Sequence, residues 1–292
     1  MYIATFKVFC DLAETGSFSK AAAINEITQS AVSQQIRALE LRFKVTLIER
    51  GRRHFALTPE GNAFLVASRE ILEVHDNLDA RLHQLRDVVE GQIKIASIFS
   101  IGLHDLPPLL KLFRDRFPKV DMVVSYRRSH EVYTLVSDGE ADLGLVAYPA
   151  KRNGLQVDVF NEDELILIVH PNHRFAGRKS VGLRALAGEN FIAFEPDTPT
   201  RKAIDRHFRE QQVAIVHAME FDNIETVKRA VEIEGGVSIV PRNTARQEIE
   251  NGVLAGVEID GARLVRPLGV ITKRNRQRSP AYQEFIAVLR AA

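Results

Sequence analysis

A short stretch of the chain carries polar side chains of the kind that hydrogen bond to DNA bases. They repeat at helical spacing and so share one side of a predicted helix: Ser30, Ser33, Gln34 and Arg37. The major groove of DNA admits a helix and shows each base pair a distinct pattern of donors and acceptors. The opposite side of the same helix is apolar and is expected to pack on a core. It consists of Val32, Ile36, Leu39 and Phe43.

The residues before this helix predict a helix-turn-helix. Thr28 can cap the helix, which then opens at Gln29, and both residues belong to the surface expected to contact DNA. Upstream, Ser19 can cap a helix that runs to Ile24. Only three residues separate that helix from Thr28, and so short a turn makes the two helices cross sharply. The alternative is an ordinary helical pair whose polar face is solvated.

A basic hairpin is predicted to follow the helix. Two short strands, 47–48 and 55–57, flank a tip that contains Gly51. The tip residues expected to contact phosphates are Arg50, Arg52, Arg53 and His54. Each charge neutralised at a phosphate adds affinity that is independent of sequence and sensitive to salt. Through residue 58 the chain holds eight Lys/Arg against five Asp/Glu, whereas the whole chain has a net charge of +1. Basic charge is therefore concentrated where DNA would bind.

The spacing of these residues resembles the winged helix-turn-helix of LysR-type transcriptional regulators. The matching positions are Ser17, Phe18, Ser19, Ala21, Ala22, 28–33, Ile36, Leu39, Glu40, Leu47, Arg50 and 57–61. Three residues depart from the family pattern: Asn25 replaces leucine, Lys44 replaces glycine and Ile48 replaces phenylalanine. A left-handed helix end at Lys44 would cost about 1 to 2 kcal/mol relative to glycine. The resemblance implies a transcription factor that binds double-stranded DNA, responds to a small molecule, forms oligomers and contacts RNA polymerase.

A long helix is predicted to connect the winged domain to the rest of the chain. Thr58, Pro59 and Glu60 favour its start, and it is expected to reach about Val89. Apolar residues recur every seven positions along it, with two more in companion positions: Phe64, Ile71, Leu78 and Leu85, then Leu82 and Val89. This pattern is typical of a coiled coil, and packing on the winged domain is the alternative.

Pairing through such a helix has a consequence for the DNA site. Two recognition helices of a dimer need half-sites about 34 to 36 Å apart, or a multiple of that distance, so we expect an inverted repeat. The heptads support a dimer, and a tetramer is implied only by the family resemblance.

From residue 92 onward, short apolar runs alternate with helical stretches. The predicted strands are 93–98, 120–126, 143–148, 165–170, 191–194, 216–221, 237–240 and 264–273, and the predicted helices are 107–117, 129–138, 200–211, 223–234 and 279–289. This rhythm predicts a parallel α/β sheet.

The family resemblance completes the expected fold. It implies an α/β protein with an N-terminal winged helix-turn-helix, a long linker helix and a two-lobed effector domain like that of periplasmic binding proteins. The expected divisions are a DNA-binding domain at 1–58, a dimerising linker at 59–90 and an effector-binding domain at 91–292. Within the last, lobe I covers about 91–161 and 268–292, and lobe II about 162–267.

Hydroxyl, amide and cationic side chains fall where helices follow the predicted strands, which is where open α/β sheets bind ligands. We expect them to hold a small anionic metabolite, an organic acid in preference to sulfate. The residues expected at this site are Ser97, Ile98, Phe99, Ser100, Ile101, Ser129, Ala147, Thr198, Thr200, Arg201 and Asn223. Each hydroxyl could instead only cap its own helix. Either Arg127 or Arg128 could face the site, since strand alternation lets only one do so readily.

Other kinds of chemistry find little support in the sequence. His170 and His173 are three residues apart, but they lie in a predicted loop without further His or Cys nearby. Phosphate-loop, nucleophile-elbow and zinc-protease patterns are absent. We therefore expect no catalytic residues, metal or cofactor. An enzyme on a binding-protein-like fold is the alternative, and an architectural DNA-binding protein with a vestigial effector domain is a third interpretation.

The composition predicts a cytoplasmic protein, associated with the nucleoid when it is bound to DNA. Charged residues interrupt the N-terminus, and no apolar run of 18 residues occurs, so neither a signal peptide nor a membrane partner is expected. The single cysteine, Cys10, excludes disulfides within the chain and is expected to be buried.

Overall fold

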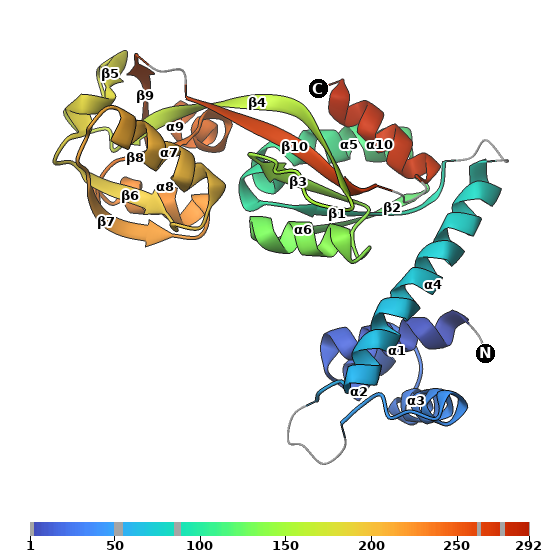
Figure 1. Ribbon diagram of the computed structural model, residues 1–292. Coiled ribbons are helices and arrows are strands. Elements are labelled where there is room, and N and C mark those ends of the chain that lie inside the picture. Colours follow the sequence, from blue (N-terminus) through green and yellow to red (C-terminus); the bar gives the residue numbers. More distant parts are fainter. Residues whose placement is uncertain (1–2, 50–54, 85–88, 262–263, 275–277, 292) are drawn as a thin grey trace. The chain divides into compact units, whose positions relative to one another are not determined.

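The computed structural model describes residues 3–49, 55–84, 89–261, 264–274 and 278–291 of the chain, and in part of the linker helix only the backbone (Figure 1). The chain forms two compact units, chiefly residues 1–88 and residues 89–292. No helix of the described residues is long and apolar enough to span a membrane.

The first unit contains four helices in its described residues: α1 (Ile3–Thr15), α2 (Phe18–Ile24), α3 (Gln29–Phe43) and α4 (Pro59–Gln84). The apolar side of α3 packs into a core with α1 and α2, and Val32, Ile36 and Leu39 are buried there. The Thr28 hydroxyl accepts a hydrogen bond from the Ala31 amide at 3.2 Å, so Thr28 caps α3 as expected. The short turn between α2 and α3 is also present.

The cap of α2 differs from the prediction. Ser17, rather than Ser19, occupies the capping position, and its hydroxyl accepts from the Lys20 amide. The reason is that α2 begins at Phe18, so Ser19 already lies inside the helix.

The predicted hairpin is reduced to a minimal pair of segments. Ile48 and Leu57 form one antiparallel bridge, and the Glu49 amide donates to the Ala56 carbonyl at 2.9 Å. The tip residues Arg50, Arg52, Arg53 and His54, together with Gly51, lie outside the described residues.

The three departures from the family pattern are accommodated locally. The Asn25 amide donates to the Asp11 carboxylate at 2.6 Å and to the Ala21 carbonyl at 2.9 Å, so a polar contact occupies the position. Lys44 ends α3 in the left-handed conformation, with φ of 56°. Ile48 is buried in the core of this unit.

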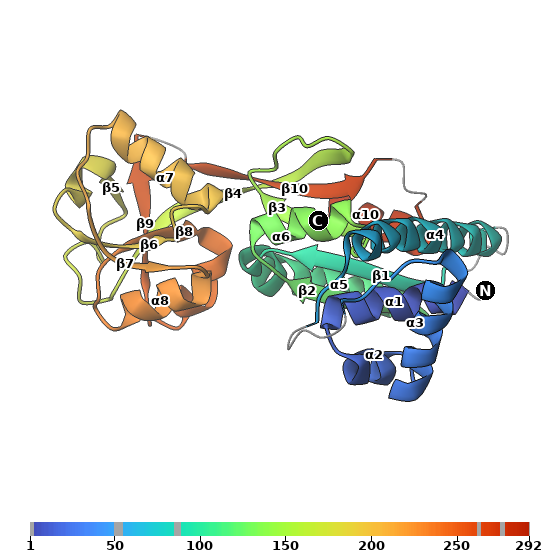
Figure 2. The ribbon, with the colours of Figure 1, turned by 60° about the horizontal axis from the view of Figure 1, so that its bottom comes forward.

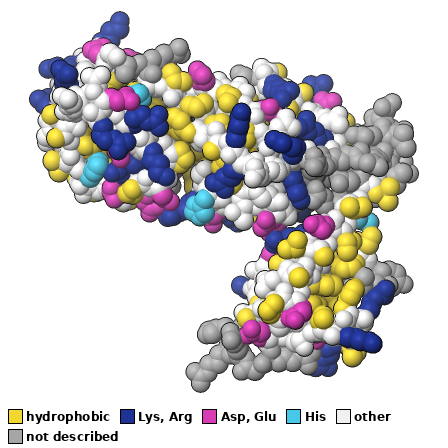
Figure 3. Space-filling view, in the orientation of Figure 1, with side chains coloured by type: hydrophobic (Ala, Val, Ile, Leu, Met, Phe, Trp, Pro, Cys, Tyr) yellow, Lys and Arg dark blue, Asp and Glu magenta, His cyan; other side chains and the backbone are white. Residues whose placement is uncertain are grey.

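Helix α4 is amphipathic, and its apolar residues differ in burial along the helix. Phe64 stacks on Phe6 with ring centroids 5.8 Å apart and also contacts Phe9, so it belongs to the core rather than to a coiled-coil seam. Further along the helix, Ile71 and Leu78 are 39% and 53% exposed. Figure 3 shows hydrophobic side chains along this helix. The Leu82 side chain and Leu85 lie outside what the structure describes.

The second unit is built on a mixed sheet rather than the parallel sheet predicted. Strands β1 (Gly91–Ser97), β2 (Val120–Tyr126) and β3 (Leu143–Ala147) are parallel. Helices α5 (Leu106–Arg116) and α10 (Pro280–Arg290) cover one face, and α6 (Ser129–Ser137) covers the other (Figures 1 and 2). We call this part lobe I.

Two long strands run from lobe I into a second lobe. Strand β4 (Leu155–Val169) pairs antiparallel with β10 (Val265–Lys273), which also pairs antiparallel with β3. The predicted counterpart of β4 began only at Leu165. The missed part is rich in charged and half-exposed residues and looks like a loop, but β10 satisfies its backbone groups.

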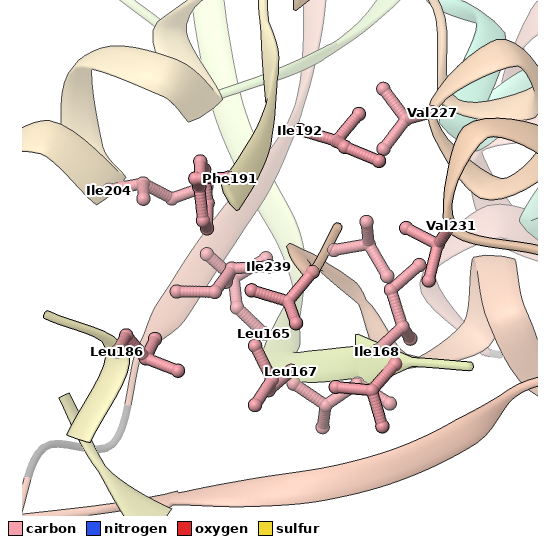
Figure 4. Close-up of a cluster of buried hydrophobic side chains, with 14 of the residues drawn as sticks. Leu165, Leu167, Ile168, Leu186, Phe191, Ile192, Ile204, Val227, Val231 and Ile239 are labelled. Atoms are coloured by element: carbon pink, nitrogen blue, oxygen red, sulfur yellow. The ribbon is translucent and has the colours of Figure 1, made fainter. Parts of the chain in front are cut away.

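Lobe II surrounds the far end of β4. It contains β5 (Ser180–Gly182), β6 (Asn190–Phe194), α7 (Pro199–Glu210), β7 (Val216–Phe221), α8 (Ile224–Glu232), β8 (Ser238–Pro241), α9 (Arg246–Glu250) and β9 (Ala255–Asp260). Strands β8 and β9 pair antiparallel with β4, whereas β6 and β7 are parallel. Figure 4 shows the core, where Leu167 of β4 and Ile239 of β8 lie among side chains from β6, α7 and α8. The sequence did not predict β5, α9 or β9.

Candidate DNA-reading surface and interlobe cleft

The polar side of α3 faces outward from the core of the first unit. Ser30, Gln34 and Arg37 are exposed and Ser33 is half-buried, on the side opposite the buried Val32. Thr28 and Gln29 are exposed at the start of the helix. The structure thus leaves these side chains available to a groove, and their role in binding stays a prediction.

A buried glutamate positions the hairpin against α3. Glu40 is 9% exposed, and its carboxylate accepts a hydrogen bond from the Leu47 amide at 2.9 Å. Glu40 follows Leu39 within the apolar stripe, and a charged residue there indicates a partner inside the fold. The position of Glu40 is therefore a signal in the sequence for this contact.

A cleft of about 400 Å³ lies between lobes I and II. Eight of the eleven predicted effector-site residues line it: Ile98, Phe99, Ser100, Ser129, Ala147, Thr198, Thr200 and Asn223. They come from the ends of β1 and β3 and from the starts of α6, α7 and α8. The structure brings these separate segments together, but it does not test whether they bind a ligand.

Three predicted residues do not line the cleft. Ser97 is fully buried and its hydroxyl donates to the Ile98 carbonyl, and Ile101 belongs to the core of lobe I. The Arg201 guanidinium turns to the other side of α7, where it binds Asp205 at 2.8 Å and Glu220 at 2.8 Å. Burial would lower the pKa of Arg201, but the hydrogen bonds to these two carboxylates outweigh it and raise the pKa. Arg201 therefore anchors lobe II.

Further residues of the cleft were not in the predicted site. They are Arg127, Arg128, His130, Arg152, Phe194, Glu195, Asp197, Pro199, Lys202, Asp222, Ile224 and Arg266. Both Arg127 and Arg128 line the cleft, because β2 ends at Tyr126 and strand alternation no longer applies beyond it. Helix α7 begins at Pro199 with Thr198 as its cap, rather than at Thr200. Thr198 followed by Pro199 is a typical helix start, and this pair is the signal that could have placed Pro199 and Lys202 in the first turn of α7, at the cleft.

The hydroxyl groups of the cleft differ in what they can still bind. The Thr198 hydroxyl accepts from the Arg201 amide and donates to the Glu195 carbonyl, so its proton is already used. By contrast, the Thr200 and Ser129 hydroxyls form no hydrogen bond with any described residue. Free donors therefore remain at the starts of α6 and α7, beside first-turn amides that have no partner within their helices.

Arg128 bridges the two lobes at the cleft. Its guanidinium lies 3.0 Å from the Glu195 carboxylate and 3.2 Å from that of Asp222. The hydrogen bond with Asp222 and the charge of Glu195 raise the pKa of Arg128. The lining contains five Lys or Arg and three Asp or Glu side chains. When the buried Asp163, which neutralises Arg266, is also counted, five positive side chains face four negative ones, and this small positive excess favours an anion.

Two further polar contacts join the lobes. His104 of lobe I lies 2.8 Å from Glu225 of α8, and the Asn243 amide of lobe II donates to Asp105 at 3.2 Å. Burial alone would raise the pKa of Glu225, but hydrogen bonds from His104 and Lys228 lower it. Burial raises the pKa of Asp105, and the negative charge of Asp163 adds to this effect.

The two histidines of possible metal spacing have separate partners. His170 lies 3.1 Å from Glu234, and His173 lies 3.3 Å from Glu189. No group of three His, Cys, Asp or Glu within the described part of the chain is arranged to hold a metal ion.

Two family models match the chain. Residues 3–62 match the bacterial regulatory helix-turn-helix protein of the lysR family, and residues 86–292 match the LysR substrate binding domain. The HTH-type transcriptional regulator CysL of Bacillus subtilis is 28% identical over 100% of this chain and 97% of its own length. A probable RuBisCO transcriptional regulator of Chlorokybus atmophyticus is 31% identical over 94% of this chain and 90% of its own. The transcriptional activator CmpR of Synechocystis is 30% identical over 97% of this chain and 93% of its own length.

Solved structures show the same fold. Full-length CbnR in complex with its target DNA covers 100% of this chain and 99% of its own, with a TM-score of 0.71 and 23% identity. The CcmR regulatory domain of Synechocystis in complex with 2-PG covers 69% of this chain and 97% of its own, with a TM-score of 0.64 and 25% identity.

Proposed function

The chain belongs to the LysR family of bacterial transcriptional regulators, and we propose that a small anionic metabolite in the interlobe cleft controls its binding to DNA. The observation that carries this proposal is the set of free donors in the cleft. Ser129 and Thr200 offer hydroxyl protons at the starts of two helices, inside a lining with an excess of basic side chains. Helix starts and cations both favour an anion.

The apolar part of the lining indicates an organic acid. The same cleft is lined by apolar side chains: Ile98, Phe99, Phe194, Pro199 and Ile224. Such side chains favour contact with the carbon atoms of an organic ligand. The CcmR domain in complex with 2-PG supports a small-molecule ligand by similarity. The ligand must prefer one arrangement of the lobes, since equal affinity for two arrangements would shift nothing.

We propose that the regulator acts as a pair of subunits. Ile71, Val74 and Leu78 lie at coiled-coil spacing on α4 and are 39%, 69% and 53% exposed, so this stripe can bury itself against a second copy. A dimer would place two α3 helices on an inverted repeat in DNA. By family resemblance the DNA-bound form contacts RNA polymerase, and it would act in the cytoplasm, at the nucleoid.

We propose that the cleft binds its ligand without changing it chemically. General acid–base catalysis needs a histidine, a carboxyl or another titratable side chain placed to exchange a proton with the substrate, and no catalytic pair is apparent among the groups that line the cleft, which include His130 and Asp197. Glu195 and Asp222 are instead held by Arg128. The three relatives described above are transcriptional regulators by name.

A binding screen tests the effector proposal. The full chain is titrated calorimetrically with inorganic phosphate, sulfate, 2-PG and a series of small mono- and dicarboxylic acids. We expect at least one of these anions to bind, and Thr200→Val to weaken that binding by roughly tenfold, since a hydrogen bond to a charged group contributes about 1.5 kcal/mol or more. Thr134→Val is the matched control, because Thr134 is exposed on α6, outside the lining of the cleft, and its hydroxyl donates to the His130 carbonyl. Absence of binding by every anion would refute the proposal.

A selection experiment tests the DNA-reading face. Duplexes that the full chain enriches from a random pool should contain an inverted repeat. Arg37→Ala should bind selected and random duplexes with more similar affinity, because a base contact has been lost. Arg42→Ala is the control, since Arg42 is exposed on another side of α3. Unchanged discrimination by Arg37→Ala would exclude this residue from base reading.

A further inference from the structure

A buried arginine lies behind one of the donors in the cleft. Arg266 of β10 is 2% exposed, and its guanidinium forms an ion pair with Asp163 of β4, which is 5% exposed. The same guanidinium donates to the Ser100 hydroxyl oxygen at 2.9 Å. Ser100 and Arg266 both line the interlobe cleft. A chain of three side chains thus runs from the cleft to the two strands that join the lobes.

The chemistry of these groups determines the direction of the hydrogen bond. A guanidinium has only donors, whereas a serine hydroxyl has one proton and can also accept. The Ser100 oxygen must therefore accept from Arg266, and its proton must point elsewhere. No hydrogen bond from Ser100 to a described residue uses that proton. Thr198 is different, because its hydroxyl proton is already donated to the Glu195 carbonyl.

We propose that Arg266 is a positioning residue that holds the Ser100 oxygen as an acceptor and leaves the Ser100 proton for the ligand, so that the cleft selects an anionic oxygen at this place. The inference rests on the anionic effector proposed above. A ligand oxygen at this point accepts the Ser100 proton, whereas a ligand N–H can use only the remaining lone pair of Ser100 and leaves that proton without a partner. Buried donors left unpaired are costly, so the selection against such a ligand is strong.

The charge of Arg266 does not account for its place in the cleft. Asp163 neutralises the guanidinium at contact distance, so the pair has no net charge to attract an anion. Stability does not account for it either, because a buried ion pair is often no better than apolar residues of similar volume. In addition, the Nε atom of Arg266 is buried and has no hydrogen-bond partner. The bond to Ser100 is thus the contact through which Arg266 can act on a ligand.

A mutant cycle in the full chain tests this inference, with inorganic phosphate as the probe. The first variant is Ser100→Ala. The second is Asp163→Asn with Arg266→Met, which removes both charges together and leaves neither buried alone. Each variant should weaken phosphate binding by roughly tenfold. The triple variant should bind no more weakly than either, because Arg266 acts only through Ser100.

The matched control is a cation that acts by charge. Lys202 is exposed in the lining of the same cleft, so the loss caused by Lys202→Met should multiply with the loss caused by Ser100→Ala. Arg266→Lys is a second test that needs no removal of charge. An ammonium also can only donate, so this variant should keep phosphate affinity within about threefold of the wild type.

The outcomes separate the inference from the proposed function. If the wild-type chain binds none of the anions in the screen, the effector proposal fails. If it binds phosphate but the losses from Ser100→Ala and from the charge-pair variant multiply, Arg266 does not act through Ser100. Wild-type affinity in the charge-pair variant would also overturn the inference. If that variant does not fold, a folded Arg266→Lys protein with a tenfold loss contradicts the proposal, and near wild-type affinity supports it.

Discussion

Replacing Gly61 with alanine should loosen the contact between α4 and the hairpin. Gly61 lies in the first turn of α4, and a Cβ atom there would be 2.1 Å from the Leu47 carbonyl oxygen. Real Cβ atoms are essentially never closer than 3.0 Å to such an atom, so α4 and the hairpin would have to separate by about 1 Å. Leu47 is fully buried, so this movement disturbs the core of the first unit.

The magnitude follows from the contacts of Leu47. Its carbonyl accepts from the Thr58 amide at 3.1 Å, and loss of this bond costs about 1 kcal/mol. Overpacking of a well-filled site adds about 1 to 3 kcal/mol. The better helix propensity of alanine offsets up to about 1 kcal/mol. We therefore expect local destabilisation of about 1 to 3 kcal/mol.

Hydrogen exchange measures this change where it occurs. Global unfolding of a chain with two units need not be two-state, whereas exchange reports the local opening of each segment. Amides of residues 45–49 and 55–60 that are described and hydrogen bonded, such as Thr58, should lose protection by about 5- to 150-fold. Weaker DNA binding should accompany this loss.

The control is a glycine with open space around it. A Cβ atom at Gly177 would meet nothing within 4 Å, so Gly177→Ala should change protection by less than about twofold. Wild-type protection around Leu47 in Gly61→Ala would refute the close approach of α4 to the hairpin.

Three other substitutions have expected outcomes. Lys44→Gly should raise the stability of the first unit by about 1 kcal/mol, because glycine relieves the left-handed conformation. Lys44→Ala should not raise this stability, and thermal unfolding of both variants measures the difference. Equal stabilities of the two variants would contradict the role of the left-handed conformation. The raised pKa of Asp105 means that the native state holds its proton to higher pH than the unfolded chain does. This contribution favours folding at low pH and is lost as the pH rises through the folded pKa, so Asp105→Asn should raise the Tm near pH 7 and the gain should shrink toward pH 4. A gain that is constant with pH would contradict this cause. Asp222→Asn should increase phosphate affinity more than Asp197→Asn, since both lower the negative charge of the cleft but only Asp222 is paired with Arg128. Equal gains in calorimetry would show that the ion pair does not compete with the ligand.

Local patterns in the sequence predicted much of the first unit correctly. The cap at Thr28 and the burial of Val32, Ile36 and Leu39 depend on neighbours within one helix and are present, whereas Phe43 at the end of the predicted stripe is 45% exposed. Phe64 shows the limit of such reasoning. It fits a heptad with Ile71, yet it packs on Phe6 and Phe9, which are more than fifty residues away in the chain.

The charged part of β4 was missed for a similar reason. Asp163 lies in a run of charged residues that resembles a solvated loop, and the sequence around it does not indicate that its carboxylate is buried. Its partner, Arg266, is 103 residues away. Only pairing of β4 with β10 brings the two charges together.

The sequence by itself determined the family, the recognition helix and most helix starts of the effector domain, because periodicity and capping act over a few residues. The tertiary structure decided which of the predicted side chains meet in the cleft. Ser100, Ser129 and Thr200 converge there from the end of β1 and the starts of α6 and α7, whereas Arg201 turns away to Asp205 and Glu220. That choice depends on how distant strands pair and on which charges they bury, and no local pattern contains this information.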